Sequence, residues 1–154
     1  MADTLSSEQR RRCMSAVRAK DTKPELVVRR LAHGLGLRFR LHAAELPGVP
    51  DLVFRSRRSV VFVHGCYWHM HTCKKGRSTP VTNATFWQTK RAATKKRDAR
   101  QRRQLARLGW SVLVVWECQT LPARRMALAD RLRTFLGTKQ ERRRRCSGPR
   151  QRQR

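Results

Sequence analysis

The densest group of reactive side chains lies in one stretch, HGCYWHMHTC, at residues 64–73. It offers two thiols and three imidazoles, and Zn²⁺ prefers four sulfur or nitrogen ligands arranged as a tetrahedron. Cys66, His71 and Cys73 can supply three ligands from this one loop, so the fourth must come from elsewhere in the chain. Cys118, just past the apolar run SVLVVW, occupies a rigid position. The sequence therefore predicts a closed structural zinc site made of Cys66, His71, Cys73 and Cys118.

The histidine of this site is not fixed by spacing. His64 or His69 could replace His71, and in an extended segment His69 and His71 would share a face unless a turn at the metal separates them. Free cysteines and surface histidines are the alternative interpretation. A small domain with a long irregular loop gains stability from a metal ion that ties the loop down, which favours the zinc site.

Acidic residues are scarce, with 10 Asp and Glu against 37 Lys and Arg, so a carboxylate beside an apolar run stands out. Asp51 opens the run DLVF and suits Mg²⁺, which prefers hard oxygen ligands. The backbone carbonyl of Val63, across a predicted hairpin, is a second candidate ligand. Glu25 lies in the first turn of a predicted helix, where it could serve the site or simply stabilise the helix dipole. Glu117 is expected to be a supporting or surface group.

Phosphodiester hydrolysis is the chemistry that these groups could perform together. That reaction needs a metal ion to neutralise developing charge, a base to activate water, and cations to hold phosphate. His69 is the candidate base, because the imidazole pKa lies near neutrality. His64 is a candidate for orienting the base or stabilising charge, although a single histidine more often has a structural role.

Aromatic residues flank the reactive stretch. Tyr67 and Trp68 are adjacent in the presumed zinc loop, and Trp87 opens a basic helix. Adjacent rings on a rigid loop cannot both easily face one core. Proteins that distort DNA insert such rings between base steps, and a mismatched step is easier to unstack. We therefore expect these rings to intercalate.

The charge of the chain points to a polyanionic partner. The formal net charge of the 154 residues is +27, and nucleic acid is the usual partner for such a field. A predicted helix at residues 84–108 is especially basic, and its contacts with phosphate should weaken with salt. From this helix we expect DNA contacts by Lys90, Arg91, Lys95 and Arg97.

Membrane and secretory roles are not expected. No apolar run approaches the roughly 20 residues that cross a bilayer, and the first residues lack the apolar core of a signal peptide. A membrane-surface role would need a basic amphipathic helix with large apolar residues, which is not evident. The odd number of cysteines, 5, favours a reducing compartment, and hence the cytoplasm.

An α/β fold must position these groups. A capping residue and Pro24 predict a helix that starts at residues 21–24 and ends by Gly34 or Gly36. Strands are expected at 37–42, 51–54, 60–63 and 111–116, with the basic helix before the last strand. The first three strands can form a meander and the fourth can join in parallel, which gives a mixed sheet flanked by helices. A last helix is expected at 122–136, with one apolar face made of Met126, Ala129, Leu132 and Phe135.

Three parts are expected along the chain. Residues 1–20 form a basic N-terminal arm, residues 21–137 form one domain with one core, and residues 138–154 form a disordered basic tail. The tail alone does not account for the charge, since the rest of the chain is also strongly basic.

Several segments in order resemble the very short patch repair (Vsr) mismatch endonucleases of bacteria. The resemblance covers about residues 10–136 and is carried by MSAVRAKDTKPE, LPGVPDLVF, VVFVHGCYWHMHTC, FWQTK and GWSVLVVWEC. It implies a restriction-endonuclease-like core and an enzyme that nicks the thymine strand 5′ to the T of a T:G mismatch. Such mismatches arise when 5-methylcytosine deaminates.

The resemblance also implies roles for single residues. Asp51 would bind Mg²⁺ and His69 would be the base, with Glu25 and His64 in support. The zinc ligands and the intercalating rings would be those named above, and Met14 and Arg18 of the arm would contact DNA. The expected cofactors are Mg²⁺ and Zn²⁺. The expected protein is a monomer in the bacterial cytoplasm, associated with the nucleoid when on DNA, and mismatch-repair proteins are candidate partners.

Four departures from the family pattern are visible. Residue 67 is Tyr where we expect Phe, and residue 63 is Val where we expect Thr. The acidic-x-Lys half of a restriction-nuclease motif is absent from VVFVHG, and the basic tail is longer than expected. Two other interpretations remain open from the sequence: a zinc-stapled DNA-binding module without catalysis, and a related nuclease that acts on other DNA structures.

Overall fold

A four-stranded mixed sheet forms the centre of the described part of the chain. The structure, a computed structural model, describes residues 6, 8–9, 11–12 and 20–137. The sheet has the order β1-β2-β3-β4, and its strands are β1 (Arg40–Leu41), β2 (Leu52–Phe54), β3 (Ser59–His64) and β4 (Ser111–Trp116). The first three strands pair antiparallel and β3 pairs with β4 in parallel, so the predicted meander with a parallel fourth strand is confirmed.

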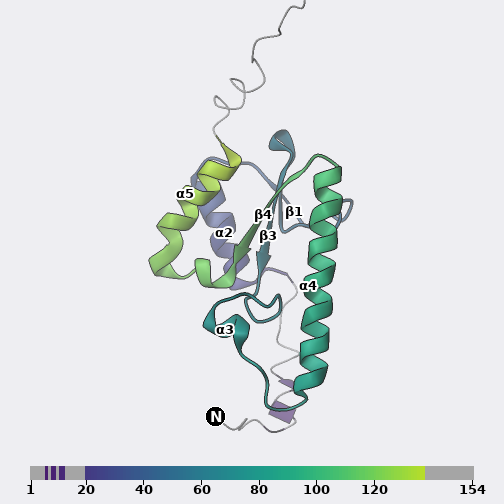
Figure 1. The fold of residues 1–154 in the computed structure, drawn as a ribbon. Helices are drawn as coiled ribbons and strands as arrows, with labels where there is room; N and C mark the ends of the chain where they lie inside the picture. The colour runs from purple at the N-terminus through teal and green to yellow at the C-terminus, as the bar shows by residue number, and fades with distance from the viewer. Residues whose placement is uncertain (1–5, 7, 10, 13–19, 138–154) are drawn as a thin grey trace, which may run out of the picture.

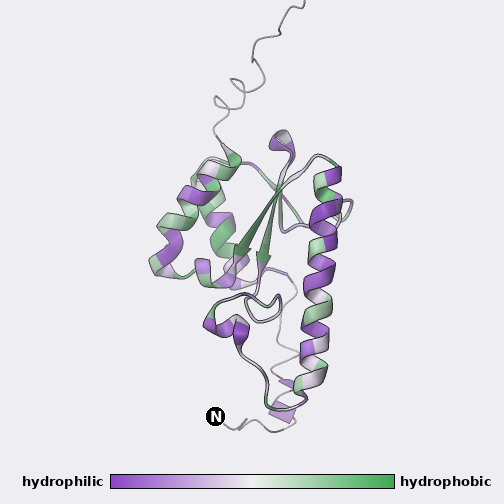
Figure 2. Cartoon of the chain, in the orientation of Figure 1, coloured by the Kyte–Doolittle hydropathy of each residue, from purple (hydrophilic) through white to green (hydrophobic). Residues whose placement is uncertain are grey.

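Helices cover both faces of the sheet (Figure 1). Helices α2 (Lys23–Gly34) and α5 (Arg125–Leu136) pack on one face, and the long α4 (Ala84–Arg107) runs along the other. Because both faces are buried, β3 and β4 are apolar along most of their length, as Figure 2 shows. Alternate residues serve opposite faces: Val61 and Val115 pack toward α2 and α5, whereas Val60 and Phe62 pack toward α4.

The first helix begins and ends where the sequence predicts. Thr22 is the N-cap and its Oγ1 accepts a hydrogen bond from Glu25 N, while Pro24 lies in the first turn. Gly36 follows the helix with a φ of +71°, a left-handed conformation that glycine adopts without strain.

Two element predictions were wrong in detail. The strand expected at 37–42 pairs only at Arg40 and Leu41. On one side β2 ends at Phe54 in a 3₁₀ turn, and on the other His42 turns the chain with a left-handed φ of 46°. The last helix begins at Arg125 after a 3₁₀ turn at Pro122–Arg124, and its buried face is Leu128, Leu132 and Leu136. Met126, expected on that face, is 83% exposed.

The buried face of helix α4 is mostly polar. Its buried residues are Arg91, Asp98 and Leu105, each separated from the next by two helical turns and hence on one face. Leu105 packs against the sheet, whereas Arg91 and Asp98 contact the loop after β3.

The predicted arm and tail, with Met14 and Arg18, lie largely or wholly outside the described residues. Also connecting the elements are 3₁₀ turns at Arg55–Arg57 and Glu117–Gln119, and a short helix α3 (Lys74–Arg77) after the Cys/His stretch. In residues 20–137, the helices are all too short or too polar to cross a membrane.

Candidate active site and metal centre

A cleft of about 680 Å³ opens where the N-terminus of α2, the end of β3 and the middle of α4 meet. Its lining includes Glu25, Asp51, Val63, His64 and His69, which are the five residues that the sequence predicts for the catalytic site. The structure therefore brings them together, although they come from separate elements. Lys20, Arg97 and Gln101 add polar and basic groups to the rim.

Asp51 stands just before β2 and reaches the opposite strand of the hairpin. Its Oδ2 accepts a hydrogen bond of 2.7 Å from the backbone N–H of Val63. Burial raises the pKa of Asp51 to about 6, with a further rise from the nearby charge of Glu25, while the Val63 N–H opposes the rise. A carboxylate held this way is poorly solvated, and a cation would compensate its charge.

The two histidines of the cleft are stacked on each other. The rings of His64 and His69 lie 3.8 Å apart at an interplanar angle of 9°. Nδ1 of His69 lies 2.5 Å from Oδ2 of Asp98 on α4. Burial, with the nearby His69, lowers the pKa of His64 to about 3, so this ring is neutral at physiological pH. Burial favours a higher pKa for Asp98, but its hydrogen bond and charge interaction with His69 lower the pKa on balance.

Asp98 is a site residue that sequence reasoning missed. In the sequence it stands out only as the single acidic residue of a helix with many cations. That isolation, together with its seven-residue spacing from Arg91 on one face, is the signal that could have found it.

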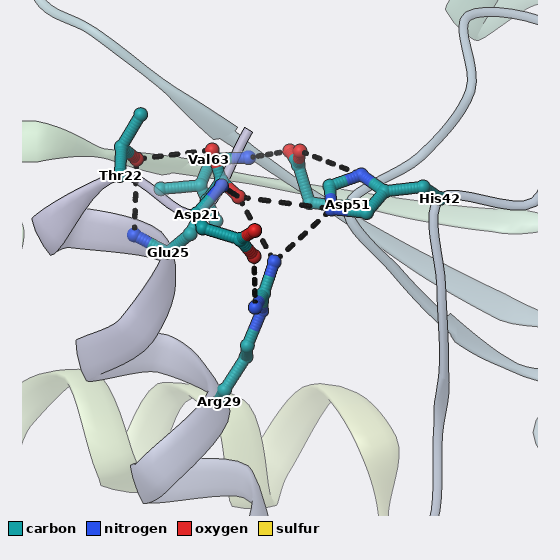
Figure 3. A network of polar contacts seen from close by, with 7 residues as sticks. All are labelled: Asp21, Thr22, Glu25, Arg29, His42, Asp51 and Val63. Atoms are coloured by element: carbon teal, nitrogen blue, oxygen red, sulfur yellow. Dashed lines mark hydrogen bonds and ion pairs between the residues drawn. The ribbon is translucent and has the colours of Figure 1, made fainter. Parts of the chain in front are cut away.

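A polar network surrounds Glu25 (Figure 3). Its carboxylate accepts hydrogen bonds from Asp21 N at 2.9 Å and Thr22 Oγ1 at 3.0 Å, at the start of α2. Arg29 donates to the same carboxylate at 3.1 Å. Glu25 thus lies in the first turn of α2 and also lines the cleft. Sequence reasoning also missed Arg29 and His42 as neighbours of the site.

The Cys/His cluster assembles as predicted. The ligand atoms of Cys66, His71, Cys73 and Cys118 all lie within 4.8 Å of one another, and Cys118 Sγ is 3.6 Å from His71 Nδ1. Zinc–sulfur and zinc–nitrogen bonds of about 2.3 and 2.0 Å place the ligand atoms of a tetrahedral site roughly 3.5–3.8 Å from one another. The four ligand atoms would therefore need to move only slightly closer together to bind the ion. Three sulfurs and one imidazole are also the donors that a closed structural zinc site uses.

A tight turn decides which histidine joins the cysteines. His69 N and His71 N donate to Gly65 O and Cys66 O, and Met70 between them has a left-handed φ of 53°. The turn sends His69 toward Asp98 in the cleft and His71 toward Cys118. His71 also stacks on Trp116 at 4.3 Å, which fixes the plane of the ring.

The thiols of the cluster differ in their environments. Burial raises the pKa of Cys66 to about 12, whereas the backbone N–H of Gly76 and the His71 side chain lower the pKa of Cys73 to about 6. Gly76 is required here, since a Cβ at this position would lie 2.0 Å from His71 O. Glu117 ties the cluster to the sheet by accepting hydrogen bonds from Cys66 N and Lys75 Nζ.

Aromatic rings form a group beside the cleft. Trp68 contacts Tyr67 at 5.1 Å and Trp87 at 5.8 Å, in edge-on geometries. Phe86, which sequence reasoning did not consider, contacts Trp87 at 5.2 Å and is 58% exposed. The three rings predicted to intercalate therefore adjoin one another, with an additional exposed ring at the start of α4.

Four residues of the basic helix were expected to contact DNA, and the structure separates one from the others. Lys90, Lys95 and Arg97 are exposed. Arg91 is buried and 3% exposed, and its guanidinium donates to the backbone carbonyls of Tyr67, Gly76 and Ser78. The Arg91 side chain therefore lies inside the protein, where its donors hold the loop that follows β3.

The chain is similar in sequence to known proteins of one family. A family model described as DNA mismatch endonuclease Vsr matches residues 2–75. The type II nicking enzyme V.XorIIP of Xanthomonas oryzae pv. oryzae is 49% identical over 136 residues, which span 88% of this chain and 98% of that protein. The chain belongs to the Vsr family. The DNA mismatch endonuclease Vsr of Escherichia coli K12 is 39% identical over 88% of each chain.

Membership of the Vsr family makes this chain a DNA endonuclease, so the cleft belongs to an enzyme that acts on DNA. A further Vsr relative, the nicking enzyme V.NmeAIP of Neisseria meningitidis, is 37% identical over 77% of this chain. The resemblance inferred from the sequence segments is thereby confirmed at the level of the family.

Proposed function

We propose that this protein nicks the thymine strand of double-stranded DNA 5′ to the T of a T:G mismatch, in an Mg²⁺-dependent reaction that initiates very short patch repair. The observation that carries the proposal is the placement of Asp51 and the His69–Asp98 pair in one cleft beside a group of aromatic rings. A binding module without catalysis would have no use for that placement.

The residues around Asp51 fit Mg²⁺. Oδ2 of Asp51 accepts a hydrogen bond from Val63 N. Oδ1 lies 3.9 Å from His42 Nδ1, which is longer than a hydrogen bond, so the lone pairs of Oδ1 remain available to a cation. Asp51 and the Val63 carbonyl would hold the ion, and Glu25 adds negative charge nearby. When bound, Mg²⁺ neutralises the charge that develops on the scissile phosphate.

His69 is suited to act as the base. Asp98 accepts the proton on Nδ1, so Nε2 carries the lone pair that can take a proton from water. Asp98 also stabilises the imidazolium that results. His64, stacked on His69 and neutral through burial, keeps the ring plane of the base fixed.

Recognition of the mismatch rests on the rings and the basic helix. Tyr67, Trp68 and Trp87 would enter the stack at the mismatch, where unstacking costs less than at a Watson–Crick step. The Tyr at 67 keeps the stacking plane expected of Phe. Lys90, Lys95 and Arg97 would hold phosphates and position the enzyme without specifying sequence.

Zinc would serve as a structural ion. The cluster of Cys66, His71, Cys73 and Cys118 encloses the loop that carries His69 and two of the rings. Binding energy from Zn²⁺ would thus stabilise both the base and the intercalating group. The mixed sheet with helices on both faces supports a restriction-endonuclease-like core around this loop. We place the protein as a monomer in the bacterial cytoplasm, at the nucleoid when on DNA, with mismatch-repair proteins as candidate partners.

The test uses labelled duplexes that carry T:G, T:A or C:G at one site. Zinc-loaded protein is incubated with each duplex with and without Mg²⁺, and the cut strand and position are mapped. We expect a nick 5′ to the mismatched T only with Mg²⁺ and T:G. Equal cutting of T:G and T:A would instead indicate a nuclease for other DNA structures.

An Asp51→Ala variant separates an enzyme from a binding module. We expect it to bind T:G duplex in a gel-shift assay while nicking falls by about 10³-fold or more, since the metal ligand is lost. If the wild-type protein binds the mismatch but cuts no strand at any Mg²⁺ concentration, the non-catalytic alternative holds.

A further inference from the structure

His42 faces two carboxylates of the cleft, those of Asp51 and Glu25, as the dashed lines of Figure 3 show. Its Nδ1 lies 3.9 Å from Asp51 Oδ1, and its Nε2 lies 4.0 Å from Glu25 Oε2. The side chain is 17% exposed, so the ring is largely enclosed by these neighbours. His42 ends the strand expected at 37–42 and had no role in the site predicted from the sequence.

Arg29 defines the tautomer of this ring. Arg29 Nη2 lies 3.1 Å from His42 Nε2, and a guanidinium only donates hydrogen bonds, so Nε2 must be the acceptor. A neutral imidazole with Nε2 as acceptor carries its proton on Nδ1, which is the nitrogen that faces Asp51. Arg29 is itself anchored by Asp21 at 2.6 Å and Glu25 at 3.1 Å.

The two oxygens of Asp51 therefore face different nitrogen donors. Val63 N–H donates to Oδ2 at 2.7 Å, and Nδ1 of His42 lies 3.9 Å from Oδ1. A short movement or one bridging water would join the Nδ1–H of His42 to Oδ1. The left-handed φ of 46° at His42 turns the ring inward at an energetic cost that an ordinary surface residue would not have.

From this geometry we infer that His42, with Arg29 behind it, is a positioning residue that orients the Asp51 carboxylate for the catalytic cation. The inference rests on the proposed Mg²⁺-dependent nicking and adds a residue to it. Groups that orient a metal-binding carboxylate typically change metal affinity or activity by about 10–100-fold when they are lost.

The test compares substitutions at residue 42 that keep or move the donor. Asn places an amide N–H near the Nδ1 position and tolerates a left-handed φ, whereas Gln places it near Nε2, and Ala removes it. His33→Ala is the matched control, because His33 is an exposed histidine at the end of α2. All variants are measured with zinc loaded.

Two quantities are measured. The first is the Kd of Mn²⁺ for the protein–DNA complex, obtained from the electron paramagnetic resonance signal of free Mn²⁺. The second is the Mg²⁺ concentration that gives half-maximal nicking of T:G duplex, called the Mg²⁺ midpoint. We expect His42→Ala to raise both the Mn²⁺ Kd and the Mg²⁺ midpoint by about 10-fold, with the rate at saturating Mg²⁺ within about three-fold of wild type. His42→Asn should keep both within about two-fold, and His42→Gln should resemble His42→Ala.

An unchanged Mn²⁺ Kd in His42→Ala, or equal behaviour of the Asn and Gln variants, overturns the inference. A loss of rate without a shift in the metal midpoint also overturns it, since His42 would then act elsewhere. If His42→Ala does not fold, the comparison of Asn with Gln decides. If wild-type protein does not nick, the proposed function fails, while the Mn²⁺ measurement still tests the positioning role.

Discussion

His69 Nδ1 and Asp98 Oδ2 lie 2.5 Å apart, which joins the loop after β3 to the middle of α4 across 29 residues of sequence. A carboxylate in this position selects the tautomer of the imidazole and stabilises its charged form. The contact therefore links a residue of the basic helix directly to the proposed chemistry.

Replacing Asp98 with Asn should slow nicking while leaving binding intact. The amide can donate to Nδ1, which would favour the wrong tautomer and remove the compensating charge. We expect the single-turnover rate on T:G duplex at saturating Mg²⁺ to fall by about 10²-fold or more. Asp130→Asn is the control, because Asp130 is an exposed carboxylate on α5 that pairs only locally with Arg133 among the contacts described. Equal rates for the two variants would remove Asp98 from the mechanism.

Replacing Asp51 with Asn should stabilise the fold above neutral pH. The folded-state pKa of Asp51 is about 6, raised from 3.8, so the folded protein holds this proton more tightly than the unfolded chain does. The stability that the protonated carboxyl contributes is present below about pH 4 and is lost as the pH rises through about 6. The Asn side chain still accepts from Val63 N but carries no charge. In Mg²⁺-free buffer, urea unfolding at pH 7.5 should show a gain of about 2 kcal/mol over wild type, and the gain should vanish near pH 4.

A gain of equal size at both pH values would show that the effect does not come from ionisation of Asp51. No gain at pH 7.5 would show that the folded protein compensates the Asp51 charge fully without a cation. Activity loss in the same variant is expected in either case.

Substituting Cys118 should release the metal and loosen the loop that carries His69. Cys118→Ser should reduce bound zinc, measured by mass spectrometry of the metal content, and lower the Tm by about 10 °C or more. Thr72→Ser is the control, because Thr72 is exposed in the same loop between two proposed ligands. A variant that keeps both its zinc and its Tm would exclude Cys118 as a ligand.

Removal of the charge should affect fold stability at Arg91 and DNA binding at Lys95. Arg91→Met leaves the carbonyls of Tyr67, Gly76 and Ser78 without their donor and should destabilise the protein by about 3 kcal/mol or more in urea unfolding. Lys95→Met should leave stability unchanged. It should instead weaken DNA binding and reduce the slope of log K against log salt by about 0.9, the value for one phosphate contact.

The chain itself determined which residues could do chemistry and most of the elements that carry them. Apolar runs that pack on both faces of the sheet define β3 and β4, and the cap at Thr22 defines the start of α2. These signals are local, since they depend on periodicity and on side-chain to backbone hydrogen bonds within a few residues. The scarcity of acidic residues likewise singles out Asp51, because composition alone makes a carboxylate beside an apolar run unusual in this chain.

Only the tertiary structure decided which partners these residues have. Periodicity cannot show that Asp98 faces His69, that Arg91 is enclosed by carbonyls, or that His42 faces two carboxylates. Each of these contacts joins segments that are distant in sequence, and each depends on how α4 and α2 pack against the sheet. The left-handed turns at His42 and Met70 have the same origin, because strained backbone persists only where the surrounding packing holds it.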